Sequence, residues 1–91
     1  MPLVFVAQTF TIKGKITNKN EPLPFVTIVN KGTTIGAISN DLGNYELKLS
    51  AGTHTLVFQY VGFKKTEHII NLTQNTEFNM DLKSEGVSLN E

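Results

Sequence analysis

The sequence predicts an all-β fold, a seven-stranded antiparallel β-sandwich. Apolar residues recur at every second position in several short stretches, and turn-forming residues separate these stretches. No stretch shows the 3.6-residue period of a helix. The 91 residues, 40% of them hydrophobic, suit one globular domain with a single core. A chain of this size leaves no room for a deep active-site cavity.

Two strands are expected in the first third of the chain. Residues 10–17 alternate between an apolar face and a Thr/Lys face, and Gly14 lies on the apolar face. A glycine there predicts that a neighbouring backbone or aromatic ring passes close to it. Residues 23–30 form the second strand, with Val26 and Ile28 inward. Pro24 should lie at its start or on an edge, because proline cannot donate a ladder hydrogen bond.

The clearest local signal is a strand–turn–strand pattern over residues 32–47. The turn is Asn40-Asp41-Leu42-Gly43, in which Asn and Asp side chains bond nearby amides and Gly accepts a positive φ. We interpret this pattern as a β-hairpin. The side chains expected to point inward are Ile38, Tyr45, Leu47 and Leu49.

Three further strands complete the count. After a hairpin-like turn at residues 50–53, the most hydrophobic run covers residues 54–61, with Leu56, Phe58 and Tyr60 inward. Gly62 marks a bend, residues 63–72 continue as a strand with a charged middle, and residues 76–83 alternate again. The sandwich domain is therefore expected over residues 9–83.

The two ends of the chain lack this pattern. Residues 1–8 are apolar up to Ala7 and then turn polar, which resembles the end of a secretory signal peptide but lacks its charged beginning. A loose apolar tail or an extra edge strand is the alternative. Residues 84–91 are expected to be a flexible linker towards a downstream domain.

Composition excludes several classes of function. Lysine plus arginine and aspartate plus glutamate number 8 each, whereas a nucleic-acid-binding protein usually has a basic excess. There is no cysteine, which removes disulfides, thiolate metal sites and cysteine nucleophiles. No apolar run reaches the length of about 18 residues that a transmembrane helix needs.

Residues that could carry chemistry are isolated from one another. The turn around Asp41 offers too few carboxylates for calcium, with only Glu46 nearby. His54 and His68 fall on different strands without acidic residues at metal-ligand spacing. No serine, Ser39 included, lies in a G-x-S-x-G nucleophile motif. We therefore expect no catalytic residues, no metal and no cofactor: the domain is predicted not to be an enzyme.

The aromatic residues divide between core and surface. Phe58 and Tyr60 are expected to fill the core, since aromatic side chains dominate burial energetics. Phe25 and Phe63 are the better candidates for an exposed partner surface. The edge strands of a sandwich also offer unpaired amides to a partner segment.

Four stretches in this order resemble the carboxypeptidase regulatory-like domain family. They are Pro22-Leu23-Pro24 with Val26-Thr27-Ile28, then Lys31-Gly32-Thr33, then residues 36–45 and residues 56–63. The resemblance covers residues 10–83 and implies a transthyretin-like (prealbumin-like) sandwich. The chain departs from the family pattern at Asn40, where Asp is usual, and at Phe25, where a small residue is usual. The first departure argues against metal at the turn, and the second suggests a bulkier outer face.

The resemblance also implies a function. Such domains commonly precede the plug of TonB-dependent outer-membrane receptors, including SusC-like glycan importers, and Val87-Ser88-Leu89-Asn90-Glu91 looks like the lead-in to the segment that reaches TonB. This implies an exported, periplasmic interaction module, with the parent receptor and TonB-type energising or signalling proteins as partners. Two alternatives remain open: an accessory domain of an extracellular peptidase or other hydrolase, and a carbohydrate-binding or adhesive module.

Overall fold

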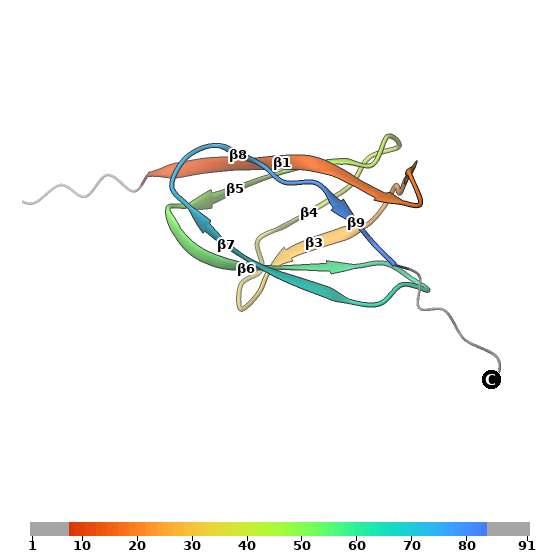
Figure 1. Cartoon of the computed structure of the whole chain (residues 1–91). Helices are drawn as coiled ribbons and strands as arrows, with labels where there is room; N and C mark the ends of the chain where they lie inside the picture. The colour runs from red at the N-terminus through yellow and green to blue at the C-terminus, as the bar shows by residue number, and fades with distance from the viewer. Residues whose placement is uncertain (1–7, 84–91) are drawn as a thin grey trace, which may run out of the picture.

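The structure, a computed structural model, describes residues 8–83 and is built from strands alone in that range (Figure 1). The strands are β1 (Thr9–Asn18), β2 (Glu21–Pro22), β3 (Thr27–Asn30), β4 (Gly36–Ile38), β5 (Asn44–Ser50), β6 (Gly52–Gln59), β7 (Thr66–Leu72), β8 (Thr76–Glu77) and β9 (Met80–Asp81). Residues 8–83 contain no helix, and hence none of the length and apolar character that crossing a membrane requires.

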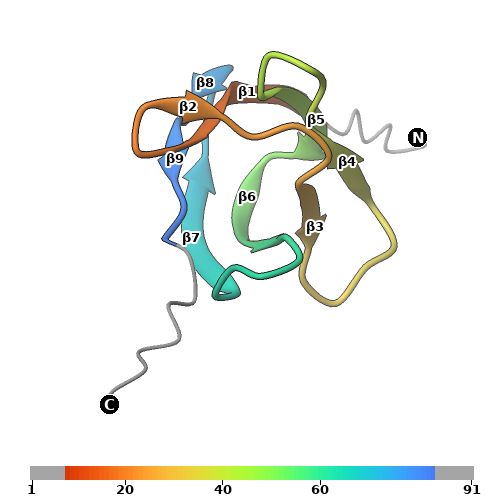
Figure 2. The same cartoon turned by 90° about the vertical axis from the view of Figure 1, so that its right-hand side faces the viewer.

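Two sheets face each other, which confirms the predicted sandwich (Figure 2). One sheet has the order β2-β1-β5, with β8 and β9 also paired to β1, and the other has the order β4-β3-β6-β7. The pairings β1·β5, β3·β4, β3·β6 and β6·β7 are antiparallel, as predicted. The short strands β8 and β9 instead run parallel to β1.

The core lies between the sheets and follows the period-2 pattern of the sequence. Strand β5 alternates strictly, so that Tyr45, Leu47 and Leu49 are buried and their neighbours are exposed. The inward predictions for Val26, Ile28, Leu56 and Phe58 are confirmed, while Tyr60 is half-buried against the core. The other buried apolar side chains are Ile12, Ile16, Val57, Leu72 and Leu82.

The predicted hairpin over residues 32–47 is wrong, although its turn is present. Strand β4 pairs with β3 in one sheet and β5 pairs with β1 in the other, so the turn carries the chain from sheet to sheet. The inward position before the turn belongs to Ser39, which is 1% exposed, and Ile38 is therefore turned outward at 64% exposure. The residue 50–53 turn likewise joins strands of different sheets, β5 and β6.

The strand count also differs from the seven expected. The second predicted strand starts at Thr27 rather than at residue 23, because a turn occupies Pro24 and Phe25. The last predicted strand is divided into β8 and β9. The division falls at Asn79, between β8 and β9. There the backbone amide of Lys15 donates to the side-chain Oδ1 of Asn79, at 2.8 Å, and not to a backbone carbonyl of the neighbouring strand.

Gly14 provides the close approach that the sequence predicts. A Cβ at this position would overlap the carbonyl oxygen of Phe78, so only glycine lets the segment between β8 and β9 cross β1 here. The same carbonyl accepts a 2.7 Å hydrogen bond from the hydroxyl of Tyr45, which lies opposite Gly14 in the β1·β5 register. Burial raises the pKa of Tyr45 to about 12.

Both chain ends lie outside the described part of the chain, apart from Gln8. Residues 1–8, a predicted signal remnant or loose tail, and residues 84–91, a predicted flexible linker, therefore stay predictions. Gln8 is exposed, and its carbonyl accepts a hydrogen bond from the amide of Ala51.

Candidate interaction surface

The Asn40 turn uses its polar side chain to close itself. The Oδ1 of Asn40 accepts hydrogen bonds from the amides of Leu42 and Asn44, at 2.9 and 3.0 Å. Gly43 takes the positive φ, +80°, that the turn requires. Within residues 8–83 no three His, Asp or Glu side chains gather as a metal site would need. The arrangement is that of a structural turn.

Each of the two histidine rings makes a contact that stabilises the fold. The Nε2 of His54 lies 2.7 Å from the carbonyl oxygen of Ser50 and must donate a hydrogen bond to it. Its Nδ1 is then left to accept a hydrogen bond from the side-chain Nδ2 of Asn30 at 3.2 Å. The ring of His68 stacks on that of Phe78, with ring centroids 4.1 Å apart. Neither arrangement resembles a nucleophile–base pair.

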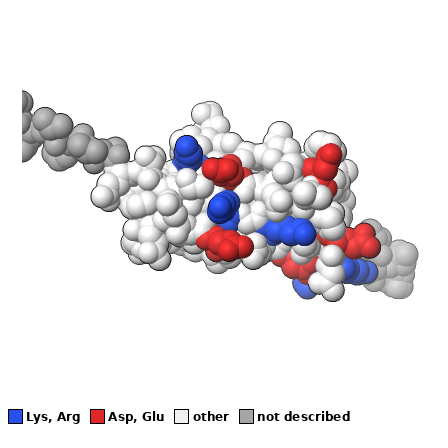
Figure 3. Space-filling model, turned by 90° about the horizontal axis from the view of Figure 1, so that it is seen from above, with Lys and Arg blue, Asp and Glu red and all other residues white. Residues whose placement is uncertain are grey.

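The outer face of the β1 sheet is polar and carries mixed charge. Figure 3, which looks down on this side of the molecule, shows lysine and acidic side chains interspersed over it. Lys13 lies opposite Glu46 of β5 and Glu77 of β8 in the strand register. A shallow hollow of about 1100 Å³ is lined by these three residues and by Lys15, Asn79 and Asp81, among others. Opposite charges alternate across it, so it favours neither anions nor cations.

The second hollow, of about 490 Å³, is aromatic and lies where β3 begins and β6 ends. It is lined by Phe25, Thr27, Gln59, Tyr60, Val61, Phe63 and Lys65, and is called the aromatic hollow below. Phe25 is 65% exposed, Val61 is 92% exposed and Phe63 is half-buried. The two residues singled out in the sequence, Phe25 and Phe63, thus line one hollow although 38 positions separate them along the chain.

Phe25 is held in an unfavourable backbone conformation. Its φ is +65°, in the left-handed region that glycine and asparagine adopt far more readily than aromatic residues. It follows Pro24 at the turn position where a type II turn requires a positive φ. Backbone strain of this kind persists only where the surrounding structure fixes it, and it often marks functional positions.

Ser39 fixes the Phe25 turn. Its hydroxyl donates to the carbonyl of Leu23 at 2.7 Å and accepts from the amide of Val26 at 2.9 Å, which bridges the ends of the turn. Its backbone carbonyl accepts from the Phe25 amide, and its own amide donates to the Val26 carbonyl, both at 2.9 Å. The four hydrogen bonds of this one buried residue therefore present Phe25 rigidly at the surface.

Sequence reasoning considered Ser39 only as a nucleophile and missed its positioning role. The signal available was weak: Ser39 is a polar residue at the inward position of an otherwise apolar alternation. A buried hydroxyl needs partners, but the sequence does not show that these lie across the fold at Leu23 and Val26.

Comparison with known proteins identifies the family. The family model of the CarboxypepD_reg-like domain matches residues 12–91. The chain belongs to this family. It is also 31% identical over 70 residues to the TonB-dependent receptor P39 of Formosa agariphila. That match covers 77% of the chain but 7% of the receptor, so the chain corresponds to a small part of this relative.

Two solved structures of similar shape support the fold alone. A chain of a type II cohesin–X-dockerin complex from Acetivibrio cellulolyticus matches with a TM-score of 0.69 at 22% identity, covering 78% of this chain and 52% of that one. A DUF3823 family protein from Parabacteroides merdae matches with a TM-score of 0.64 at 17% identity, covering 87% and 47%. At such identities no binding property is transferred.

Proposed function

We propose that this domain is a non-catalytic interaction module, the periplasmic N-terminal extension of a TonB-dependent outer-membrane receptor. The observation that carries the proposal is the 31% identity to a TonB-dependent receptor over 77% of the chain. The receptor would take up a nutrient, with glycans as the candidate class. In this role the domain binds proteins, namely the rest of its receptor and TonB-type energising or signalling proteins.

The aromatic hollow is the part of the surface that best fits protein binding. Exposed aromatic side chains on a rigid support lose little entropy when a partner covers them, and aromatic residues are enriched at the centres of protein interfaces. Phe25 meets this description because Ser39 fixes its turn. The mixed charges of the opposite face and the net charge of zero support a role without nucleic acid.

The proposal is tested first in the parent gene and then in the cell. The sequence that follows codon 91 should encode a plug and a transmembrane barrel, and the product should fractionate with the outer membrane. A peptidase or other hydrolase domain after Glu91 would refute the receptor role and favour the accessory-domain alternative.

Binding is tested with the domain itself. Purified periplasmic domains of the TonB-type proteins from the same cell should shift the backbone amide resonances of residues near Phe25 and Phe63. Soluble oligosaccharides should leave these resonances unchanged. The reverse pattern would refute the protein-binding role and favour the carbohydrate-binding alternative.

A further inference from the structure

The backbone groups of β7 point alternately towards its neighbour β6 and towards the edge of the sheet. The amide of Lys31, just after β3, donates to the carbonyl of Thr55 at 2.8 Å, so every second residue of β6 from Thr55 onwards bonds towards β3. The intervening residues of β6 bond towards β7, where their partners include Thr66, His68 and Ile70. The backbone amides and carbonyls that point away from β6 are those of Glu67, Ile69 and Asn71.

This edge of the sheet is unpaired within residues 8–83. β7 pairs with β6 alone and lies at one end of the order β4-β3-β6-β7 (Figure 2). In that range, no hydrogen bond outside the β6 ladder involves the backbone of Glu67, Ile69 or Asn71. The amide of Lys64, just before β7, donates to the carbonyl of Lys83 at 3.4 Å, which marks where the unpaired edge begins. Such a row of backbone donors and acceptors is a template for another strand.

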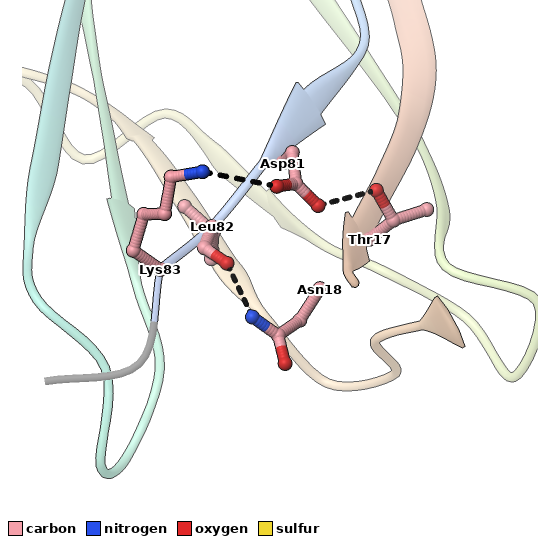
Figure 4. Close-up of polar contacts among 5 residues, drawn as sticks. All are labelled: Thr17, Asn18, Asp81, Leu82 and Lys83. Atoms are coloured by element: carbon pink, nitrogen blue, oxygen red, sulfur yellow. Dashed lines mark hydrogen bonds and ion pairs between the residues drawn. The ribbon is translucent and has the colours of Figure 1, made fainter. Parts of the chain in front are cut away.

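The other sheet edges in the described part of the chain have features that prevent strand pairing. β2, β8 and β9 have two residues each and β4 has three, so each offers only a short ladder. β5 is longer, but the exposed charged side chains of Glu46 and Lys48 lie in its middle. At β9, the Asp81 carboxylate accepts a hydrogen bond from the Thr17 hydroxyl at 3.1 Å and lies 3.6 Å from Lys83 Nζ, so this edge is charged as well (Figure 4). β7 has seven residues and contains no proline, glycine or lysine.

The side chains along β7 are complementary to a second copy of the same strand. Ile69, 68% exposed, lies two positions after Glu67 and two positions before Asn71. A two-fold axis at Ile69 pairs two copies of β7 antiparallel, with Ile69 opposite Ile69 and each Glu67 opposite an Asn71. Moving the axis by one position sets Ile69 opposite Glu67 or Asn71, and moving it to Glu67 sets two carboxylates opposite each other. The register centred on Ile69 is therefore the favourable one, and the net charge of zero removes long-range repulsion between copies.

We propose that β7 pairs with β7 of a second copy of this chain, antiparallel and about a two-fold axis at Ile69. The backbone of Ile69 exchanges hydrogen bonds with Ile69 of the second copy, and the backbone of Glu67 does so with Asn71. The sheet β4-β3-β6-β7 then continues across the axis into the same sheet of the second copy. A single strand pair buries less than the roughly 1,200 Å² of a standard interface, so the dimer is weak and forms at about 0.1 mM and above.

This inference goes beyond the proposed function. If the domain is part of a receptor, pairing through β7 brings two receptor molecules together. The β7 edge and the aromatic hollow share no residue, so pairing with a second copy and binding of another protein can be tested separately. The pairing is a property of this chain, and its test does not involve a receptor.

Sedimentation velocity of the chain of residues 1–91 tests whether it dimerises. The weight-average mass is expected to rise from the 10.1 kDa of one chain towards twice that mass between about 10 μM and about 1 mM. A mass that stays at that of one chain up to about 1 mM would overturn the proposal. Growth beyond two chains would also overturn it, because a two-fold contact closes on itself.

Amide hydrogen exchange at the same concentrations locates the contact. The amides of Glu67, Ile69 and Asn71 should exchange more slowly as the concentration rises. The amides of Gly36 and Ile38, which point away from β3 at the β4 edge, should not change. Concentration-dependent protection at β4 or elsewhere, without protection at β7, would overturn the proposal.

Substitutions at the axis test the register. Ile69→Lys sets two like charges opposite each other and should keep the chain monomeric, and Ile69→Glu should do the same. An equimolar mixture of the two variants should dimerise again, because opposite charges then meet at the axis. The mixture also excludes misfolding as the cause, since only folded chains can present β7 to each other. A mixture that stays monomeric would overturn the two-fold register.

Ile38→Lys is the matched control. Ile38 is similarly exposed, at 64%, but lies in β4 at the opposite edge of the same sheet. This variant should dimerise like the wild-type chain, and an effect equal to that of Ile69→Lys would overturn the proposal. Failure of any of these tests leaves the receptor assignment intact, because that rests on the gene beyond codon 91.

Discussion

Replacing Gly14 with alanine is expected to detach the crossing segment between β8 and β9 from β1. The added Cβ would overlap the carbonyl oxygen of Phe78, lie 2.6 Å from its carbonyl carbon and lie 3.1 Å from Asn79 Oδ1. The nearest two of these atoms are backbone, so no side-chain rotation can relieve the overlap. The segment has to move away from β1.

The expected loss of stability follows from the hydrogen bonds at this crossing. Movement breaks the bond from the Phe78 amide to Lys13, the bond from the Lys15 amide to Asn79 and the bond from Tyr45 to Phe78, which measure 2.8, 2.8 and 2.7 Å. At about 1 kcal/mol net for each bond, the variant loses about 3 kcal/mol of unfolding free energy. For a domain of this size, that lowers the melting temperature by about 12–24 °C.

Thermal and urea unfolding, followed by circular dichroism, measure this loss. The double variant with Tyr45→Phe provides an internal check, because Gly14→Ala should already have broken the tyrosine bond. Tyr45→Phe is therefore expected to cost about 1 kcal/mol in the wild-type chain and much less in the Gly14→Ala chain. If Gly14→Ala lowers the melting temperature by less than about 4 °C, or if the two effects are strictly additive, the segment between β8 and β9 stays on β1 and the expected detachment is wrong.

Three further outcomes are expected. The pKa of Tyr45 is raised from 10.0 to about 12 in the folded state, so the unfolded state loses its proton first. The free energy of unfolding is therefore unaffected by the ionisation of Tyr45 below pH 10. It falls by about 2–3 kcal/mol in total as the pH rises from 10 to about 12. Urea unfolding at rising pH should show this loss in the wild-type chain but not with Tyr45→Phe. Ser39→Ala leaves a buried amide and carbonyl without their bridge and should cost about 1–3 kcal/mol, measured by urea unfolding; a neutral result would contradict its positioning role. Adding a chelator should leave the melting temperature unchanged, whereas a clear drop would reveal a stabilising metal ion.

Local alternation predicts which side chains of a strand are buried, but not which sheet the strand joins. Tyr45, Leu47 and Leu49 could be placed inward because one buried face of a strand imposes a period of two. The same rule failed at Ile38, because the chain leaves one sheet there and enters the other, and the buried position falls to Ser39. Partner choice depends on residues far away in the sequence, which a local pattern does not contain.

The candidate surface was predictable in part. Phe25 and Phe63 could be named from the sequence because each falls outside the inward alternation of its strand. Their position in one hollow depends on tertiary structure, and so does the strained φ of Phe25, which Ser39 stabilises from another strand end. Gly14 was the exception: a glycine on a buried strand face is itself a local sign of close approach.

Deletion of residues 9–83, in frame, from the parent gene tests whether this domain acts in receptor-dependent uptake. The measurement is nutrient uptake by cells that carry either form, with receptor abundance in the outer membrane determined in parallel. We expect the shortened receptor to reach the outer membrane in normal amounts while its TonB-dependent uptake is altered. A full-length receptor carrying Phe25→Asn should shift uptake in the same direction. Unchanged uptake at normal abundance would refute the proposed interaction role of the domain.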